Sequence, residues 1–370
     1  MPVFNTARLV PGLIESIATQ VATFDEGSYG PLRVLMIDNC STDGTVDAIH
    51  SAASEHGLSH RVDVIENPSN LGLARSLNTG LASIHTDFVL TCHADCRFLT
   101  PDYVMQAVRL LSDDDSLAAV TGVPVLDDAA TMIDRLYAAS NLMDLGAVDD
   151  PRLPDSDLVQ DIGFAEGRCD AFRMDALRQA GFYDVRVRLA GEDQLMAARF
   201  IEAGYRVVQH RGLLYVLGLS PQQDSLMRTV AHQRRLGQPA AFILSHPGVS
   251  AGALGARAGK NRRSRSLLRA MQVVNVLGLA WLTSRLLSPR SRSLRHVVGP
   301  LVVIVAATSA RQAQMQTAPG VRLAPRDRVM LLVMQPLWDG AWAEGFVEGA
   351  VQAAIARLRA ETNGTGGDAE

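Results

Sequence analysis

The first half of the chain alternates short apolar runs with segments of helical periodicity, and this alternation restricts the fold more than any other feature. Runs of about six apolar residues have the length of strands, and repeats at spacings of three and four are typical of helices. The expected strands are 32–37, 61–65, 87–92 and 117–121. The expected helices are 9–20, 45–55, 74–84 and 102–111. Strands that alternate with helices predict a three-layer α/β domain with a mainly parallel sheet.

The first strand of this pattern is almost missing. Residues 1–5, MPVFN, read as the end of a strand and the loop that follows it. A central strand this short gives up ladder hydrogen bonds and buried apolar surface. We therefore expect either that the native start lies upstream or that the first strand is unusually short.

Composition sets the class of the molecule. With 370 residues, 47% hydrophobic and 20% charged, the chain can bury a full core and has room for a second domain. Its formal net charge of −4 argues against a nucleic-acid-binding surface spread over the whole protein. The four cysteines show no C-x-x-C spacing, and the N-terminus does not read as a secretory signal. We expect a cytoplasmic location, in a reducing environment.

The character of the sequence changes after residue 255. A basic run at 257–265 precedes a mainly apolar stretch at 267–287, and a second basic run at 285–295 precedes a shorter one at 297–307. Polar residues interrupt the first stretch and the second is too short to span a bilayer, which favours interfacial or buried helices. The domains expected are a catalytic domain at 1–255, a helical region at 256–360 that contacts the inner face of the membrane, and a disordered tail at 361–370. The alternative for the helical region is a soluble appendage with solvated arginines.

Polar side chains follow two of the expected strands. Asp38 and Asn39 come directly after the strand expected at 32–37, before a loop of small and hydroxyl residues. Beyond the next strand, Gly72 opens a helix. In α/β sheets these loops converge where ligands bind, and side chains here can read a base or ribose. The alternative is that Thr42 or Asp43 only caps a helix.

A third strand ends in LTCHADCRF, residues 90–98. His93 and Asp95 could hold a metal, Cys92 and Cys96 could be reactive thiols, or the stretch could be a plain polar loop.

These three motifs, in this order, resemble the nucleotide-sugar-binding half of family 2 glycosyltransferases, which have the GT-A fold. The resemblance runs from residue 1 to about 238. It implies that Asp95 holds a divalent cation, Mn²⁺ or Mg²⁺, with His93 at the first motif position, where Mn²⁺ suits an imidazole better than Mg²⁺ does. The cysteines are then packing residues. The residues that the resemblance assigns to the donor substrate are Pro2, Asn5, Asp38, Asn39, Ser41, Asp43, Asn70, Gly72, Arg75, Asn78, His93, Arg234 and Arg235.

The pair Glu192-Asp193 begins a segment of helical periodicity that ends at Gly204. A helix N-terminus favours a carboxylate over a carboxylic acid. By resemblance, Asp193 is the general base that deprotonates the acceptor hydroxyl in an inverting displacement. The alternative is an N-cap Asp beside a solvated Glu.

Arg234 and Arg235 lie where processive relatives carry Gln-x-x-Arg-Trp, but His232 and Leu236 replace the Gln and the Trp. The region near residues 215–219 lacks the metal-binding His that many relatives have there. We therefore expect a non-processive enzyme that moves a sugar from a UDP- or dTDP-type donor to a hydroxyl of a glycan or a polyprenyl-linked acceptor. The alternatives are a catalytically silent nucleotide-sugar-binding scaffold and a sugar nucleotidyltransferase.

Overall fold

The fold was analysed in a computed structural model, which describes residues 1–25, 27, 29–126, 130–140, 158–163, 165, 167–187, 191–218, 225–244, 270–278, 302–311 and 323–364. The strands are β1 (Pro2–Val3), β2 (Val34–Asp38), β3 (Val62–Glu66), β4 (Phe88–Cys92), β5 (Cys96–Phe98), β6 (Leu117–Val125), β7 (Val159–Asp161), β8 (Cys169–Arg173) and β9 (Arg206–Leu217). The helices of the first lobe are α1 (Val10–Asp25), α2 (Thr45–Glu55), α3 (Leu73–Ala82), α4 (Tyr103–Asp113), α6 (Met174–Ala180) and α7 (Glu192–Glu202). The remaining labelled helices are α5 (Met132–Ser140), α8 (Leu226–Leu244) and α11 (Pro325–Gly364). Residues 270–278 and 302–311 are also helical.

The strands form two sheets. In the first, β1, β2 and β3 are parallel, with Val3 opposite Asp38 and Asp38 opposite Glu66. In the second, the order is β4-β8-β6-β9-β5, and β7 pairs with β9. The pair β6–β9 is parallel, while β8 runs antiparallel to both β4 and β6. Of the strands that polar residues follow, β2 and β3 pair with each other in the first sheet, and β4 pairs with β8 in the second.

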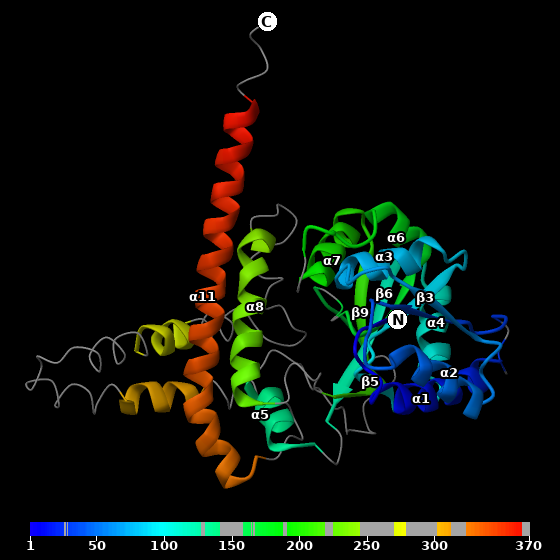
Figure 1. The fold of residues 1–370 in the computed structure, drawn as a ribbon, viewed down its shortest axis with the longest axis horizontal. Coiled ribbons are helices and arrows are strands. Elements are labelled where there is room, and N and C mark those ends of the chain that lie inside the picture. Colours follow the sequence, from blue (N-terminus) through cyan, green and yellow to red (C-terminus); the bar gives the residue numbers. More distant parts are fainter. Residues whose placement is uncertain are drawn as a thin grey trace, which may run out of the picture.

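Helices cover both faces of the sheets (Figure 1). On one side, α1 presents Leu13, Ile14 and Ile17, spaced at one helical turn, to a core that also includes residues of α2 and α4. On the other, Leu77 of α3 and Phe200 of α7 belong to a second apolar cluster. Each large side chain buried in this way contributes roughly 1.5–3 kcal/mol relative to exposure. The expected three-layer α/β class is confirmed.

The expected strands and helices of the first half all form, with ends that differ by a few residues. The helix at 45–55 has the expected bounds, and the helix expected at 9–20 continues to Asp25 because Val21 and Phe24 extend its buried face. In this chain the first strand contributes only Pro2 and Val3 to the ladder with β2. Both alternatives for its short length stay predictions.

The C-terminal helices form a separate layer beside the first lobe (Figure 1). In this layer, α8 runs along the long helix α11. At the base of this layer, Arg135 of α5 donates to the fully buried carboxylate of Asp327 at 2.8 Å. Both α5 and α8 precede residue 255, so part of the expected catalytic domain packs with the appendage. The helix α11 continues to Gly364, into the segment expected to be a disordered tail, because Ala, Arg and Glu favour helix. Among the described residues, no helix has the length and apolar character needed to cross a membrane.

Glycines set the distance between α8 and α11. A Cβ atom added to Gly345 would lie 1.9 Å from the carbonyl oxygen of Arg234, and one on Gly349 would lie 1.8 Å from that of Gln238. A Cβ atom on Gly237 would meet the carbonyl of Trp342 at 2.1 Å. Backbone atoms cannot yield as a flexible side chain does, so these positions require glycine while the helices stay this close.

We expect Gly345→Ala and Gly349→Ala each to lower the free energy of unfolding by about 1–3 kcal/mol, because the added methyl group forces the two backbones apart. Urea denaturation monitored by circular dichroism measures the change. The matched control is Val347→Ala, on an exposed position of the same helix, which we expect to change stability by less than about 0.5 kcal/mol. Glycine variants as stable as this control would contradict the close packing of α8 and α11.

Candidate active site

The loops after β1 and β2 bind one another. The backbone N–H of Asn5 donates to Ser41 Oγ at 2.9 Å, and Asn5 Oδ1 accepts from the N–H of Thr42 at 2.9 Å. Asp43 Oδ2 accepts from the N–H of Ala7 at 3.1 Å. These bonds fix the shape of the strand ends. Asn5, Ser41 and Asp43 thus use these polar atoms to connect the two loops. Their predicted role in binding the donor substrate stays a prediction.

Asn39 joins the second loop to the third. Its Oδ1 accepts from the N–H of Leu71 at 2.8 Å and from Asn67 Nδ2 at 3.3 Å, and its Nδ2 donates to Asn70 Oδ1 at 2.8 Å. The buried Asn39 is therefore a connector between loops. Asn70 Oδ1 also accepts from the N–H of Gly72, the residue before α3.

Asp38 differs from its neighbour. Its Oδ2 accepts from the N–H of Ser41 at 3.0 Å, whereas its buried Oδ1 has no hydrogen-bond partner in the part of the chain that the structure describes. A buried acceptor without a donor is costly, which makes this oxygen suited to a donor group of a ligand. Pro2 lies within β1, and Arg75 is exposed on the first turn of α3.

Asn78 connects the two halves of the lobe. Its side chain donates to the carbonyl of Tyr183 at 2.9 Å and accepts from the N–H of the same residue at 3.0 Å. The next residue, Asp184, accepts from Arg186 at 2.6 Å and from Arg199 at 3.1 Å. Hydrogen bonds from Arg186 outweigh the effect of burial and lower the pKa of Asp184 to about 2. This network fixes the GFYD turn, and with it the buried ring of Tyr183.

His93 and Asp95 follow β4, as expected. The N–H of His93 donates to the carbonyl of Arg168 at 2.9 Å, and Asp95 Oδ2 lies 3.9 Å from the guanidinium of the same arginine. Burial lowers the pKa of His93, and its Nε2 is enclosed by protein without a hydrogen-bond partner among the described residues. In that part of the chain no group of three His, Cys, Asp or Glu side chains is arranged to hold a metal ion.

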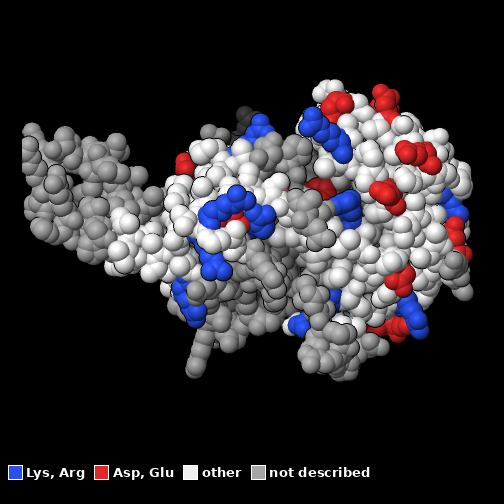
Figure 2. All heavy atoms as spheres, turned by 90° about the horizontal axis from the view of Figure 1, so that it is seen from below, with Lys and Arg blue, Asp and Glu red and all other residues white. Residues whose placement is uncertain are grey.

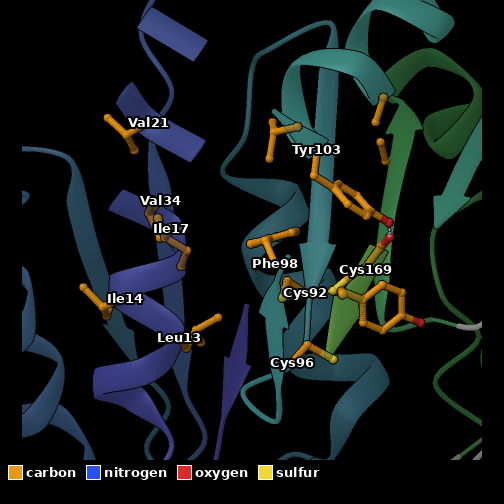
Figure 3. Packing of buried hydrophobic residues seen from close by; sticks show 14 of the residues in the cluster. Leu13, Ile14, Ile17, Val21, Val34, Cys92, Cys96, Phe98, Tyr103 and Cys169 are labelled. Carbon is orange, nitrogen blue, oxygen red and sulfur yellow. Dashed lines mark hydrogen bonds between the residues drawn. The ribbon is translucent and has the colours of Figure 1, made fainter. Parts of the chain in front are cut away.

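The thiols of this stretch lie in the core behind the site. Figure 3 shows Cys92, Cys96 and Cys169 together near Phe98 and Tyr103, and the Sγ atoms of Cys92 and Cys169 are 3.4 Å apart. Burial raises the pKa values of the Cys96 and Cys169 thiols, which disfavours the reactive thiolate. Their surroundings are those of packing residues.

Glu192 and Asp193 form the first turn of α7, behind Gly191 with its positive φ of 95°. Glu192 is buried, which raises its pKa and favours the protonated form. Asp193 is half-buried, accepts from the N–H of Gln194 at 2.8 Å, and lines a small cavity together with Asp170 and Tyr183. The two adjacent carboxyl groups therefore have different environments: Glu192 is buried, whereas Asp193 is half-buried and lines the cavity.

The helix α8, in the C-terminal layer, carries the basic residues His232, Arg234 and Arg235. Burial, together with the charges of Arg235 and Arg168, lowers the pKa of His232 to about 4, and the charge of Asp95 opposes this effect. Arg234 differs from Arg235: its guanidinium pairs with Glu348 and, at 3.4 Å, with Glu344 of α11. Of the two neighbouring arginines that the resemblance assigns to the donor substrate, Arg234 is thus paired with carboxylates of α11.

Arg168, Asp170, Tyr183 and His232 are site residues that the sequence motifs did not identify. Asp170 is fully buried and its Oδ2 accepts from the N–H of Gly167 at 2.6 Å. Arg168 lies in the same loop, and its charge acts on Asp95, Glu192 and His232. A single arginine just before a buried strand was the available signal, but local spacing does not show that β8 pairs with β4.

The comparisons agree with this geometry. Residues 1–179 match the family described as Glycosyl transferase family 2. Pre-mycofactocin glycosyltransferase of Mycobacterium tuberculosis, from two strains, is 28% identical over 178 residues, which make up 48% of this chain and 35% of that protein. The chain thus matches about a third of the length of these relatives. Mannosyltransferase PcManGT from Pyrobaculum calidifontis, solved in complex with GDP-Man and Mn²⁺, superposes with a TM-score of 0.53 at 19% identity, over 94% of this chain and 85% of that chain.

The superposition with this mannosyltransferase gives the lobe the GT-A glycosyltransferase fold. Residues 1–179 belong to the family 2 glycosyltransferases.

The Asp184 network allows a test of how the GFYD turn is held. A carboxyl group with a lowered pKa stabilises the fold above its unfolded value of 3.8, and this contribution is lost as the pH falls through about 2. We expect Asp184→Asn to cost about 1–2 kcal/mol at pH 7, allowing for solvent screening, with a difference from wild type that narrows below pH 3.8. Urea denaturation across this pH range measures it.

The control is Asp63→Asn, which removes the carboxylate of an exposed pair with Arg33 and should cost less than about 1 kcal/mol. An Asp184→Asn loss that is the same at pH 7 and near pH 2 would mean that packing, and not charge, holds the turn.

Proposed function

We propose that the protein is an inverting, non-processive glycosyltransferase that moves a sugar from a nucleoside-diphosphate sugar to an acceptor hydroxyl. The observation that carries this proposal is the position of Asp193, half-buried at the N-terminus of α7, on the wall of a cavity shared with Asp170 and Tyr183. The helix dipole favours its ionised form, which a general base needs. Family membership of residues 1–179 supplies the reaction class.

In this mechanism the acceptor oxygen attacks the anomeric carbon while the bond from that carbon to the diphosphate oxygen breaks. Asp193 takes the proton of the acceptor hydroxyl. The electron pair of the broken bond leaves with the nucleoside diphosphate. Attack from the face opposite the leaving group inverts the anomeric centre. Glu192, whose pKa is raised by burial, contributes shape and polarity next to the base.

The donor would lie across the carboxyl ends of β1, β2 and β4, where ligands of α/β sheets bind. Asp38 Oδ1 offers an acceptor there for the base or the ribose. The rigid loops that contain Asn5, Asn39 and Ser41 would hold its position. A UDP- or dTDP-type nucleotide remains our proposal for the donor.

We expect Asp193→Asn to reduce sugar transfer about 10²- to 10⁴-fold while donor binding changes little, because the amide cannot accept the proton. The measurement is release of nucleoside diphosphate from a panel of UDP-, dTDP- and GDP-sugars, with a membrane and glycan extract as the source of acceptor. Thermal stabilisation by the same donors reports binding.

Asp175→Asn is the matched control, since Asp175 lies in the first turn of α6 and is exposed. We expect full activity from it. Equal transfer by Asp193→Asn and wild type would remove Asp193 as the base, and donor binding without any transfer by wild type would favour a silent scaffold.

We further propose that the acceptor is lipid-linked and that the C-terminal helices contact the inner face of a membrane. The helices 270–278 and 302–311 turn polar groups inward and apolar groups outward. Asn275, which is fully buried, donates to Asp339 of α11 at 2.9 Å and accepts from Ser309 at 3.4 Å. Leu277 is 64% exposed and Val303 66% exposed.

This pattern is the reverse of a helix that faces water, where the apolar side is buried. It is typical of helices that face lipid, whose polar side chains meet inside the bundle. Further exposed apolar residues on these two helices are Val273, Val274, Val302 and Ile304. The sequence that joins the helices contains Arg285, Arg290, Arg292 and Arg295, a composition suited to anionic lipid head groups. Figure 2, which views the molecule from below, shows several basic side chains grouped on this face around an acidic one.

We expect the full chain to sediment with vesicles that contain phosphatidylglycerol and to bind neutral vesicles less well. The double variant Leu277→Gln/Val303→Gln should lose most of this binding, because it removes about two buried apolar side chains from the contact. Leu99→Gln, at an exposed apolar position of the catalytic lobe, is the control and should bind like wild type. A wild-type protein that stays in the supernatant with both vesicles would contradict the membrane contact.

A further inference from the structure

The residues after β4 fit poorly to a divalent cation. Asp95 is the one carboxylate of the HAD stretch, and its Oδ2 already has a guanidinium 3.9 Å away. The other predicted ligand, His93, has its Nε2 enclosed by protein. A divalent cation bound to Asp95 would lie close to the positive charge of Arg168, and like charges repel most strongly where water is excluded.

Arg168 occupies the centre of the site. Its carbonyl receives the N–H of His93, so its backbone is anchored to the end of β4. Its side chain is 23% exposed, so it is shielded from most of the solvent but not closed off from it.

We propose that Arg168 supplies the positive charge that binds the donor diphosphate and stabilises the departing nucleoside diphosphate, without a requirement for a divalent cation. The planar guanidinium matches phosphate oxygens through paired hydrogen bonds and is always charged at physiological pH. The 3.9 Å separation from Asp95 Oδ2 is an ion-pair distance, longer than a hydrogen bond.

This inference rests on the proposed function and goes beyond it. It assigns the diphosphate to an arginine that precedes β8, in place of a metal held by the HAD stretch. The two assignments make opposite demands on Asp95 and Arg168. If a cation is the binding group, Asp95 is essential and Arg168 hinders it. If the guanidinium is the binding group, Arg168 is essential and Asp95 is not.

The experiment is calorimetric titration of UDP, dTDP and GDP into the full chain, in EDTA and in MnCl₂, with wild type, Arg168→Gln, Arg168→Lys and Asp95→Asn. In EDTA we expect wild type to bind at least one of the diphosphates. Arg168→Gln should weaken that binding about 10- to 100-fold, the usual range for loss of charged hydrogen bonds. Arg168→Lys should recover part of it. Asp95→Asn should bind within a few-fold of wild type.

Arg178→Gln removes an exposed arginine of α6 and is the control for net charge, with no change expected. Circular dichroism of each variant checks folding, and release of nucleoside diphosphate from the donor sugar in EDTA provides the activity measurement. Binding by wild type only with Mn²⁺, abolished in Asp95→Asn and retained in Arg168→Gln, would overturn the inference and leave the proposed function intact. Absence of diphosphate binding by wild type in both buffers would overturn both.

Discussion

The antiparallel pairing of β8 with β4 is the interaction on which the site depends. Cys92 lies opposite Cys169 in this register, so the loop after β4 and the loop before β8 meet at one point. Asp95 and Arg168, 73 residues apart in sequence, are brought together by that pairing. A shift of the register by one residue would turn the buried cysteines toward the opposite face and move the guanidinium away from the carboxylate. The pairing of β4 with β8 therefore produces both the contact between the Cys92 and Cys169 thiols and the charge pair of Asp95 with Arg168.

Around this pair, several polar side chains of the site hydrogen-bond to neighbouring loops. Asn39 uses its amide to connect the second and third loops, and Asn78 connects α3 to the backbone of Tyr183. Such networks fix loops that would otherwise lose conformational freedom on binding a substrate. Asp38 Oδ1, at the end of β2, and the Asp193 carboxylate, at the N-terminus of α7, are the groups that we propose contact the donor and the acceptor.

The C-terminal layer joins the catalytic lobe through α8. This helix carries His232 and Arg235 into the site on one side, and packs by backbone contact at Gly237 against α11 on the other. The helices 270–278 and 302–311 attach to the same α11 through Asn275 and Asp339. A membrane contact through these helices would therefore place the cleft at a fixed height above the lipid surface. The proposed lipid-linked acceptor and the proposed diphosphate site are connected by one helix.

The sequence by itself determined the α/β class, the positions of the first strands and helices, and the polar residues at their ends, because hydrophobic period and turn chemistry are local properties. It also located Glu192-Asp193 at a helix start, since the helical repeat that follows is plain in the sequence. Only the tertiary structure decided that Asn39 and Asn78 bind neighbouring loops, that Arg234 and Arg235 face different partners, and that Arg168 meets Asp95. These are contacts between strands and helices far apart in the chain, and their register is set by packing of the whole core, which no short stretch of sequence encodes.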